Sequence, residues 1–393
     1  MAPPDGQPLA GSIARLALFA LAVALITSRV GLVTHELVGH GGAALACDAE
    51  IAEVRLYVFA GGWISYQRAA PWTWPEALVV QLAGIAIELL LAGVAAVAAW
   101  RARCAAGRSS SGALAVAFGG AALGLVVHAG FYLAAGTYHG VGDGALLYRA
   151  LGDDRIWLAL PLALAVTAVT FAGARLLAAT VRAWLPARSA AGQVAALGLA
   201  LGLAGGAHAG LAAVELAARP SPTYRAIMRP ARDQAIDHDL ARWAQVEATR
   251  GRPPDRAATT AHRRQLDDDR PAELPFGLVL GLAIAVAGAA GVAAGRPVRG
   301  AAGPDAGAAT IPGTGNGQLV RPRGRSIPAS FVARRSLTEG KLHSSRLAIG
   351  AARPRSPIDL SIPGPLPLSA LRWAVTAAVI AALSMRGIDA LAP

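Results

Sequence analysis

Long apolar runs alternate with short polar stretches along the chain, and seven of the apolar runs are long enough to cross a bilayer. A hydrocarbon core about 30 Å thick needs roughly 20 apolar residues in an α-helix. The pattern therefore predicts an all-α polytopic membrane protein with about seven transmembrane helices. The expected spans are Ile13–Val33 (continuing to about Cys47), Pro75–Trp100, Gly112–Ala135, Ile156–Trp184, Gln193–Leu216, Leu274–Ala294 and Leu366–Leu383.

Composition agrees with this fold class and sets bounds on partners. Of the 393 residues, 54% are hydrophobic and 15% are charged, which is too apolar for a soluble protein of this length. The net charge of +12 arises mainly from arginines in loops, where they act as topology signals, so the expected partner is the lipid bilayer and no nucleic acid is expected. Two cysteines, Cys47 and Cys104, give no disulfide framework. Abundant Ala, Gly and Arg with a single lysine, Lys341, indicate a bacterial cytoplasmic membrane.

Polar stretches divide the chain further. Within the polar stretch before the sixth span, Thr223–Arg250 is expected to form one or two amphipathic helices, and Pro253–Arg270 a linker. A long stretch before the last span is rich in Pro, Gly, Ser and Arg, which predicts disorder. The expected divisions are a membrane core at 1–155, additional transmembrane helices at 156–216, an extramembrane polar segment at 217–273, a transmembrane helix at 274–294, a disordered basic loop at 295–363 and a C-terminal transmembrane helix at 364–393.

A short β-hairpin is expected after the first helix. Two β-prone runs within Ile51–Tyr66 flank Gly61-Gly62, and alternating strands joined by glycines are typical of a hairpin. Such a hairpin would offer a sheet edge to an extended peptide. The alternative is an interfacial loop anchored at headgroup level by Trp63, Trp72 and Trp74.

The first candidate site is Thr34-His35-Glu36-Leu37-Val38-Gly39-His40-Gly41, at the end of the first apolar run. Titratable side chains are costly in a membrane, so a His-Glu-His cluster there indicates function. Neutral imidazoles bind zinc, and an adjacent Glu can act as a general base. The alternative is a helix end with two interfacial histidines and a glutamate in water.

The spacing of the two histidines is one residue longer than in HExxH. At roughly 100° per residue, an i, i+4 pair lies about 40° apart on an α-helix, whereas an i, i+5 pair lies about 140° apart. A regular helix would point His35 and His40 toward different faces. A π-bulge, a helix distortion common at functional sites, would bring them together. Gly39 eases such a distortion, so we expect the helix there to depart from α geometry or to end.

The second half of the site is Gly142-Asp143-Gly144, which follows the third span. An Asp between glycines at a helix end can bring its carboxylate close to a ligand. Two histidines and one carboxylate leave the fourth zinc position open, as in catalytic sites. The alternative is an ordinary Gly-Asp-Gly turn. His139 is a nearby alternative ligand or supporting group.

Together these motifs resemble the site-2 protease family of intramembrane zinc metalloproteases. HELVGH at His35–His40, EVRLYVFAGGWISY at Glu53–Tyr66 and GDGALLYRAL at Gly142–Leu151 follow the family's order of a metal-binding helix, a hairpin-like segment and an Asp-Gly helix start. The resemblance covers about residues 16–151, with the longer HExxxH motif and without the family's Asn-Pro pairs. It implies a metalloprotease-like core at 1–155, a Zn²⁺ cofactor, His35, His40 and Asp143 as metal ligands, and Glu36 as the catalytic base.

The expected function is cleavage of a membrane-associated protein substrate by an intramembrane zinc metalloprotease with a Glu general base. The alternative is a catalytically degenerate membrane scaffold or a transporter-like protein, although the chain shows no convincing internal repeat. Glu88 and His128 lie within apolar spans and could support the metal ligands or form a polar clamp between helices, the clamp being favoured. Asp237-His238-Asp239 could contact a metal but lies in a charged, solvated stretch.

Overall fold

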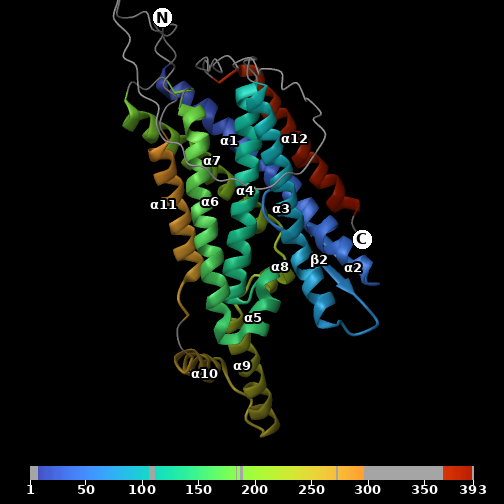
Figure 1. The fold of residues 1–393 in the computed structure, drawn as a ribbon. Coiled ribbons are helices and arrows are strands. Elements are labelled where there is room, and N and C mark those ends of the chain that lie inside the picture. The colour runs from blue at the N-terminus through green and yellow to red at the C-terminus, as the bar shows by residue number, and fades with distance from the viewer. Residues whose placement is uncertain are drawn as a thin grey trace, which may run out of the picture. The chain divides into compact units, whose positions relative to one another are not determined.

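The computed structural model describes residues 8–105, 111–182, 184–185, 189–270, 273–295 and 366–391. Seven helical segments in this part of the chain are long and apolar enough to cross a membrane, which confirms the predicted fold class (Figure 1). The predicted disordered loop at 295–363 lies outside the described residues except for Gly295. The main helices are α1 (Leu9–Val33), α3 (Trp74–Cys104), α4 (Ser111–His139), α6 (Ile156–Arg182), α7 (Ala190–Ala218), α11 (Phe276–Ala294) and α12 (Leu368–Leu391).

The predicted hairpin is also confirmed. Strand β1 (Glu50–Leu56) pairs antiparallel with β2 (Gly62–Gln67), with a register irregularity between Ile51 and Glu53. The connecting loop, 57–61, is longer than a tight turn and ends at Gly61. Side chains of the hairpin reach the first helical segment, where a Cβ on Gly41 would lie 3.2 Å from Ile64 Cδ1. The hairpin is therefore packed beside the segment that carries the two histidines.

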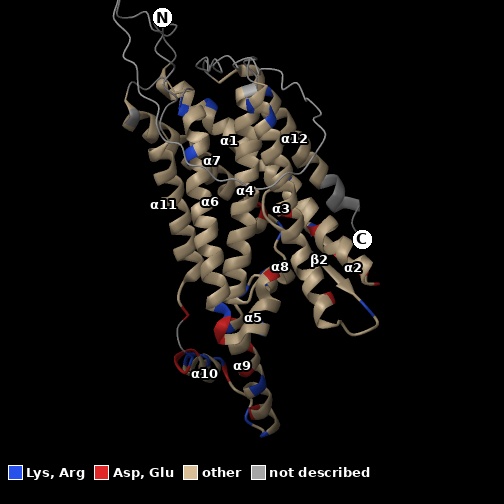
Figure 2. Cartoon of the chain, in the orientation of Figure 1, with Lys and Arg blue, Asp and Glu red and all other residues tan. Residues whose placement is uncertain are grey.

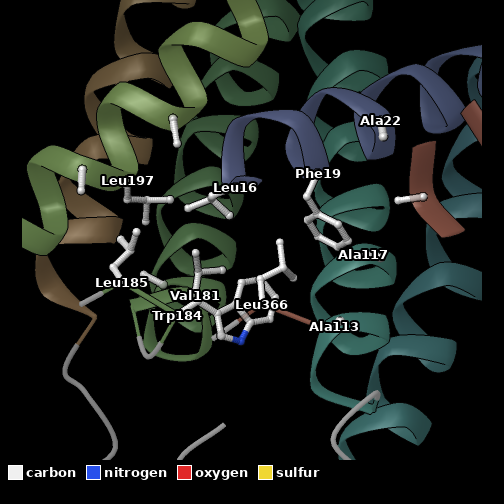
Figure 3. Close-up of a cluster of buried hydrophobic side chains, with 14 of the residues drawn as sticks. Leu16, Phe19, Ala22, Ala113, Ala117, Val181, Trp184, Leu185, Leu197 and Leu366 are labelled. Atoms are coloured by element: carbon white, nitrogen blue, oxygen red, sulfur yellow. The ribbon is translucent and has the colours of Figure 1, made fainter. Parts of the chain in front are cut away.

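Small residues let the transmembrane helices approach closely. Helix α4 packs against both α3 and α6, α11 packs on α6, and α1 contacts α7 and α12. Alanines make up much of the buried apolar set, as expected where helices associate in lipid through close packing. Larger side chains fill one end of the bundle, where Phe19 of α1 meets Trp184 edge to face with ring centroids 6.0 Å apart (Figure 3).

The polar segment before α11 folds into three helices: α8 (Pro222–Ile227), α9 (Ala231–Thr249) and α10 (Arg256–Asp268). The first two confirm that the stretch expected to form amphipathic helices, Thr223–Arg250, is helical. The linker expected at Pro253–Arg270 is wrong, because most of it is helix α10. Asp255 caps that helix by accepting a hydrogen bond from Ala258 N at 2.7 Å.

Contacts between α9 and α10 hold the polar segment together. Trp243 stacks on His262, with ring centroids 4.2 Å apart, and Arg232 Nη1 lies 2.7 Å from Asp267 Oδ1. Charged side chains are spread over these two helices, whereas the transmembrane helices carry few (Figure 2). Helix α10 is thus stabilised by its cap and by its contacts with α9.

Candidate metal centre

The histidine motif lies in a π-helix. Helix α1 continues without a break into the π-helical segment Thr34–Gly41 and then into α2 (Gly42–Ala46). Hydrogen bonding from i to i+5 brings residues five apart onto one face, which an α-helix would not do. The expected departure from α geometry around Gly39 is therefore confirmed, and the longer spacing of His35 and His40 matches the local helix.

The two histidines and the distant aspartate converge. His35 Nε2 lies 3.0 Å from His40 Nε2 and 3.1 Å from Asp143 Oδ2, and His40 Nε2 lies 3.2 Å from Asp143 Oδ1. All three side chains are buried. Two ligands of one zinc ion, with bonds of about 2.0–2.2 Å and a tetrahedral angle, lie about 3.3–3.6 Å apart. The three groups could therefore hold a metal ion with only small adjustments.

Asp143 is positioned by a tight turn between α4 and the short helix α5 (Ala145–Leu151). The turn, Gly142–Gly144, is 3₁₀-helical, and Gly142 has φ +48°, a left-handed conformation that favours glycine. A side chain on Gly144 would collide with the backbone of α4. Gln81 of α3 donates a hydrogen bond from Nε2 to Gly142 O at 2.8 Å. The flanking glycines thus allow the turn to pack closely against α4, and Gln81 of α3 anchors the turn through the carbonyl of Gly142.

A backbone carbonyl of α3 orients His40. His40 Nδ1 lies 2.7 Å from Val80 O. A carbonyl oxygen can only accept, so Nδ1 carries the proton and, in the neutral ring, Nε2 presents its lone pair. That lone pair points toward His35 and Asp143. This is the tautomer that a metal ligand requires, fixed by a hydrogen bond on the opposite ring nitrogen.

Gly84 of α3 leaves the space into which the imidazoles point. A Cβ at this position would lie 2.6 Å from His35 Nε2 and 2.7 Å from His40 Nε2, closer than real side chains approach. Gly84 also lies against the π-helix, where a Cβ on Gly39 would lie 2.6 Å from Gly84 Cα. Gly84 could not be predicted from the sequence, because a glycine in an apolar span carries no chemical signal.

The donor set fits a divalent cation. Asp143 Oδ2 is buried without a hydrogen-bond partner among the described residues, although it lies close to His35 Nε2. Lone pairs of two imidazoles and a carboxylate thus face one another with little to separate them, which is unfavourable unless a cation or protons lie between them. Two His nitrogens and a carboxylate oxygen are ligands that zinc accepts.

A cavity of about 890 Å³ adjoins the centre. His35 and Glu36 line it at one end, together with polar side chains of α3 and α4, and its remaining walls are mostly apolar. Glu36 is buried, lines this cavity and directly follows the candidate ligand His35 in the chain. On the hairpin, burial and the nearby carboxylates of Asp143 and Glu36 raise the pKa of the Tyr66 phenol. Strand β2 packs against the π-helical segment that carries the two histidines.

Other candidate ligands lie elsewhere. His139 faces Glu273, with Nδ1 3.2 Å from Oε2, and does not join the cluster. Asp237 pairs with Arg229 and Arg263, while Asp239 pairs with Arg270, so this stretch forms ion pairs within the polar helices.

Comparisons with protein-family models, with curated proteins and with solved structures give no match. What the chain does is therefore inferred from its own residues and their geometry.

Proposed function

We propose that this chain is an intramembrane zinc metalloprotease that cleaves a membrane-associated protein substrate. The convergence of His35, His40 and Asp143 beside Glu36 carries the proposal. Two imidazoles and one carboxylate leave a coordination position for substrate or water, as catalytic zinc sites do. The seven apolar helices support an integral membrane protein, and the Arg-rich composition with one lysine favours a bacterial cytoplasmic membrane.

In this proposal three residues bind the metal and a fourth transfers a proton. His35, His40 and Asp143 would hold zinc, which when bound polarises the scissile carbonyl and lowers the pKa of water. Glu36 would accept a proton from the attacking water and pass it to the leaving amine nitrogen. Peptide and water are then converted to a carboxylic acid and an amine. The position of Glu36, on the cavity wall next to a ligand, suits this role.

The cavity and the hairpin indicate where a substrate would lie. The mostly apolar walls run along α1, α4 and α7, which suits a substrate segment that comes from the membrane. A peptide in lipid must have its backbone groups hydrogen-bonded, and the hairpin provides strand backbone beside the π-helix. We propose that the substrate unwinds next to the hairpin and is cut at the cavity end nearest Glu36.

The experiment compares Glu36→Gln with Glu247→Gln, using a membrane-tethered reporter and zinc-loaded protein. Glu36→Gln keeps the shape of the side chain but removes the base, so cleavage should fall by about 10²–10⁴-fold while zinc is retained. Glu247 pairs with Arg250 and Arg252 in the polar helix α9 and does not line the cavity, so its variant should cleave like wild type. Equal cleavage by Glu36→Gln and wild type would contradict the protease and favour the degenerate scaffold or transporter-like protein.

A further inference from the structure

Glu88 lies in the middle of α3, an otherwise apolar helix, and its side chain is only 3% exposed. A carboxylate buried at this depth is expensive and persists only with partners or a function. The groups around the Glu88 carboxylate therefore indicate its role.

Two histidines flank the Glu88 carboxylate. Both of its oxygens lie 3.1 Å from His128 Nδ1 on α4, and Oε2 lies 3.7 Å from His35 Nδ1 on the π-helix. Gly31 of α1 borders the group, since a Cβ there would lie 3.5 Å from Glu88 Oε1, an ordinary contact distance. The carboxylate thus occupies a pocket between α1, α3 and α4 that borders the candidate metal centre.

The His35 ring needs a partner for its second nitrogen. His35 Nδ1 is buried and has no hydrogen bond from the described residues, and Glu88 Oε2 at 3.7 Å is a carboxylate that faces it. His35 Nε2 points toward His40 and Asp143, so the proton of the neutral ring belongs on Nδ1. A modest movement of either side chain would close this gap to a charge-assisted hydrogen bond.

One face of helix α3 therefore contacts both histidines. Val80, Gly84 and Glu88 are spaced four residues apart and so lie on the same face of the helix. Val80 O fixes the ring of His40, Gly84 leaves space at the two Nε2 atoms, and Glu88 faces the ring of His35. Metal-ligating histidines commonly donate their other N–H to a carbonyl or a carboxylate, and this helix provides one of each.

We propose that Glu88 is a positioning residue for the metal centre, which fixes the tautomer and orientation of His35 when the metal is bound. This inference rests on the proposed zinc site. His128 is a secondary partner: its side chain is 62% exposed, stacks against Tyr132 and holds the opposite side of the carboxylate. A purely structural clamp between α3 and α4 would instead need Glu88 and His128 equally.

Cobalt(II) titration of metal-free protein separates these roles, because it reports affinity and ligand geometry without any substrate. The variants are Glu88→Leu, which removes the carboxylate; Glu88→Gln, which keeps an acceptor oxygen; and His128→Leu, which removes only the partner on α4. Removing one partner of a buried pair is destabilising, so insertion and folding of each variant are first verified by size-exclusion chromatography in detergent.

Glu88→Leu should weaken cobalt binding by about 10–100-fold and alter the visible spectrum of the bound ion. Glu88→Gln should restore part of the affinity, and His128→Leu should match wild type. Affinity and spectrum equal to wild type in folded Glu88→Leu would overturn the inference. If Glu88→Leu and His128→Leu weaken binding equally, the clamp explains the result and the inference also fails.

The results that would contradict the proposed protease differ from those that would contradict the positioning role of Glu88. If cobalt binding depends on Glu88 while Glu36→Gln cleaves like wild type, the protease is contradicted and the positioning role stands. If zinc-loaded wild type cleaves and Glu88→Leu binds cobalt normally, only the positioning role is overturned. A folded wild-type protein that takes up no cobalt overturns both.

Discussion

The Nε2 atoms of His35 and His40 lie 3.0 Å apart although the two histidines are five positions apart in the chain. The π-helical segment Thr34–Gly41 makes this possible by adding one residue to a turn that would otherwise be α-helical. Val38, within the segment, is 56% exposed and contributes no ligand. The segment therefore behaves like the shorter HExxH arrangement with one inserted residue.

Deletion of Val38 should preserve metal binding. The shortened motif can adopt an ordinary α-helix with its histidines at i, i+4, which again places them on one face. We expect about one zinc per chain in the purified variant, as for wild type. Insertion of an alanine after Val38 is the matched control and should abolish binding, because the histidines would then be six residues apart. Metal loss in a folded deletion variant would contradict the inserted-residue account.

Gly84→Ala should block the metal centre without removing a ligand. The new Cβ would lie 2.6 Å from His35 Nε2 and 2.7 Å from His40 Nε2, so at least one ring must rotate away. Displaced ligands should lower zinc affinity by roughly 10–100-fold or more, measured by competition with a chelator. Gly93→Ala on the same helix is the control, since no described atom lies within 4 Å of its Cβ. Equal affinities in the two variants would show that Gly84 does not border the metal.

The seven spans, the hairpin and the residues of the candidate metal centre could be predicted because each has a local signal. Apolar length marks a span, glycines between β-prone runs mark a hairpin, and a His-Glu-His cluster stands out in a membrane segment. The part played by α3 could not be predicted, because Val80 acts through its carbonyl and Gly84 through a missing side chain. Both depend on which helix packs against the π-helix.

Helix α10 escaped prediction for a related reason. Its sequence is strongly polar, and its less polar side consists mostly of small alanines, so hydropathy does not mark it as a helix. It is stabilised by the Asp255 cap and by ion pairs such as that between Arg263 and Asp237 of α9. These partners are known only once α9 is placed beside it.

Glu215→Ala should loosen the hairpin loop that borders the cavity. The Glu215 carboxylate of α7 accepts hydrogen bonds from the backbone N–H groups of Val58, Phe59 and Ala60 at 2.7, 2.5 and 3.1 Å. A buried N–H group left without an acceptor costs about 1–3 kcal/mol. Amide hydrogen exchange at these three residues should therefore accelerate in the variant.

The control for the loop is Glu53→Ala, which removes an exposed carboxylate from strand β1 of the same hairpin. Exchange at 58–60 should stay at the wild-type rate in that protein. Unchanged protection in Glu215→Ala would mean that the opposite contacts, from Arg29 Nη1 to Tyr57 O and Ala60 O at 2.5 and 2.7 Å, hold the loop by themselves.

The most direct measurement is the metal content of purified wild type, His40→Ala and Asp143→Ala by elemental analysis. Each alanine removes one ligand from a centre with three protein ligands, so wild type should carry about one zinc per chain and both variants close to none. Asp143→Ala is decisive, because more than a hundred residues separate Asp143 from the histidines. A folded wild-type protein without zinc, or an Asp143→Ala variant that retains it fully, would contradict the metal centre.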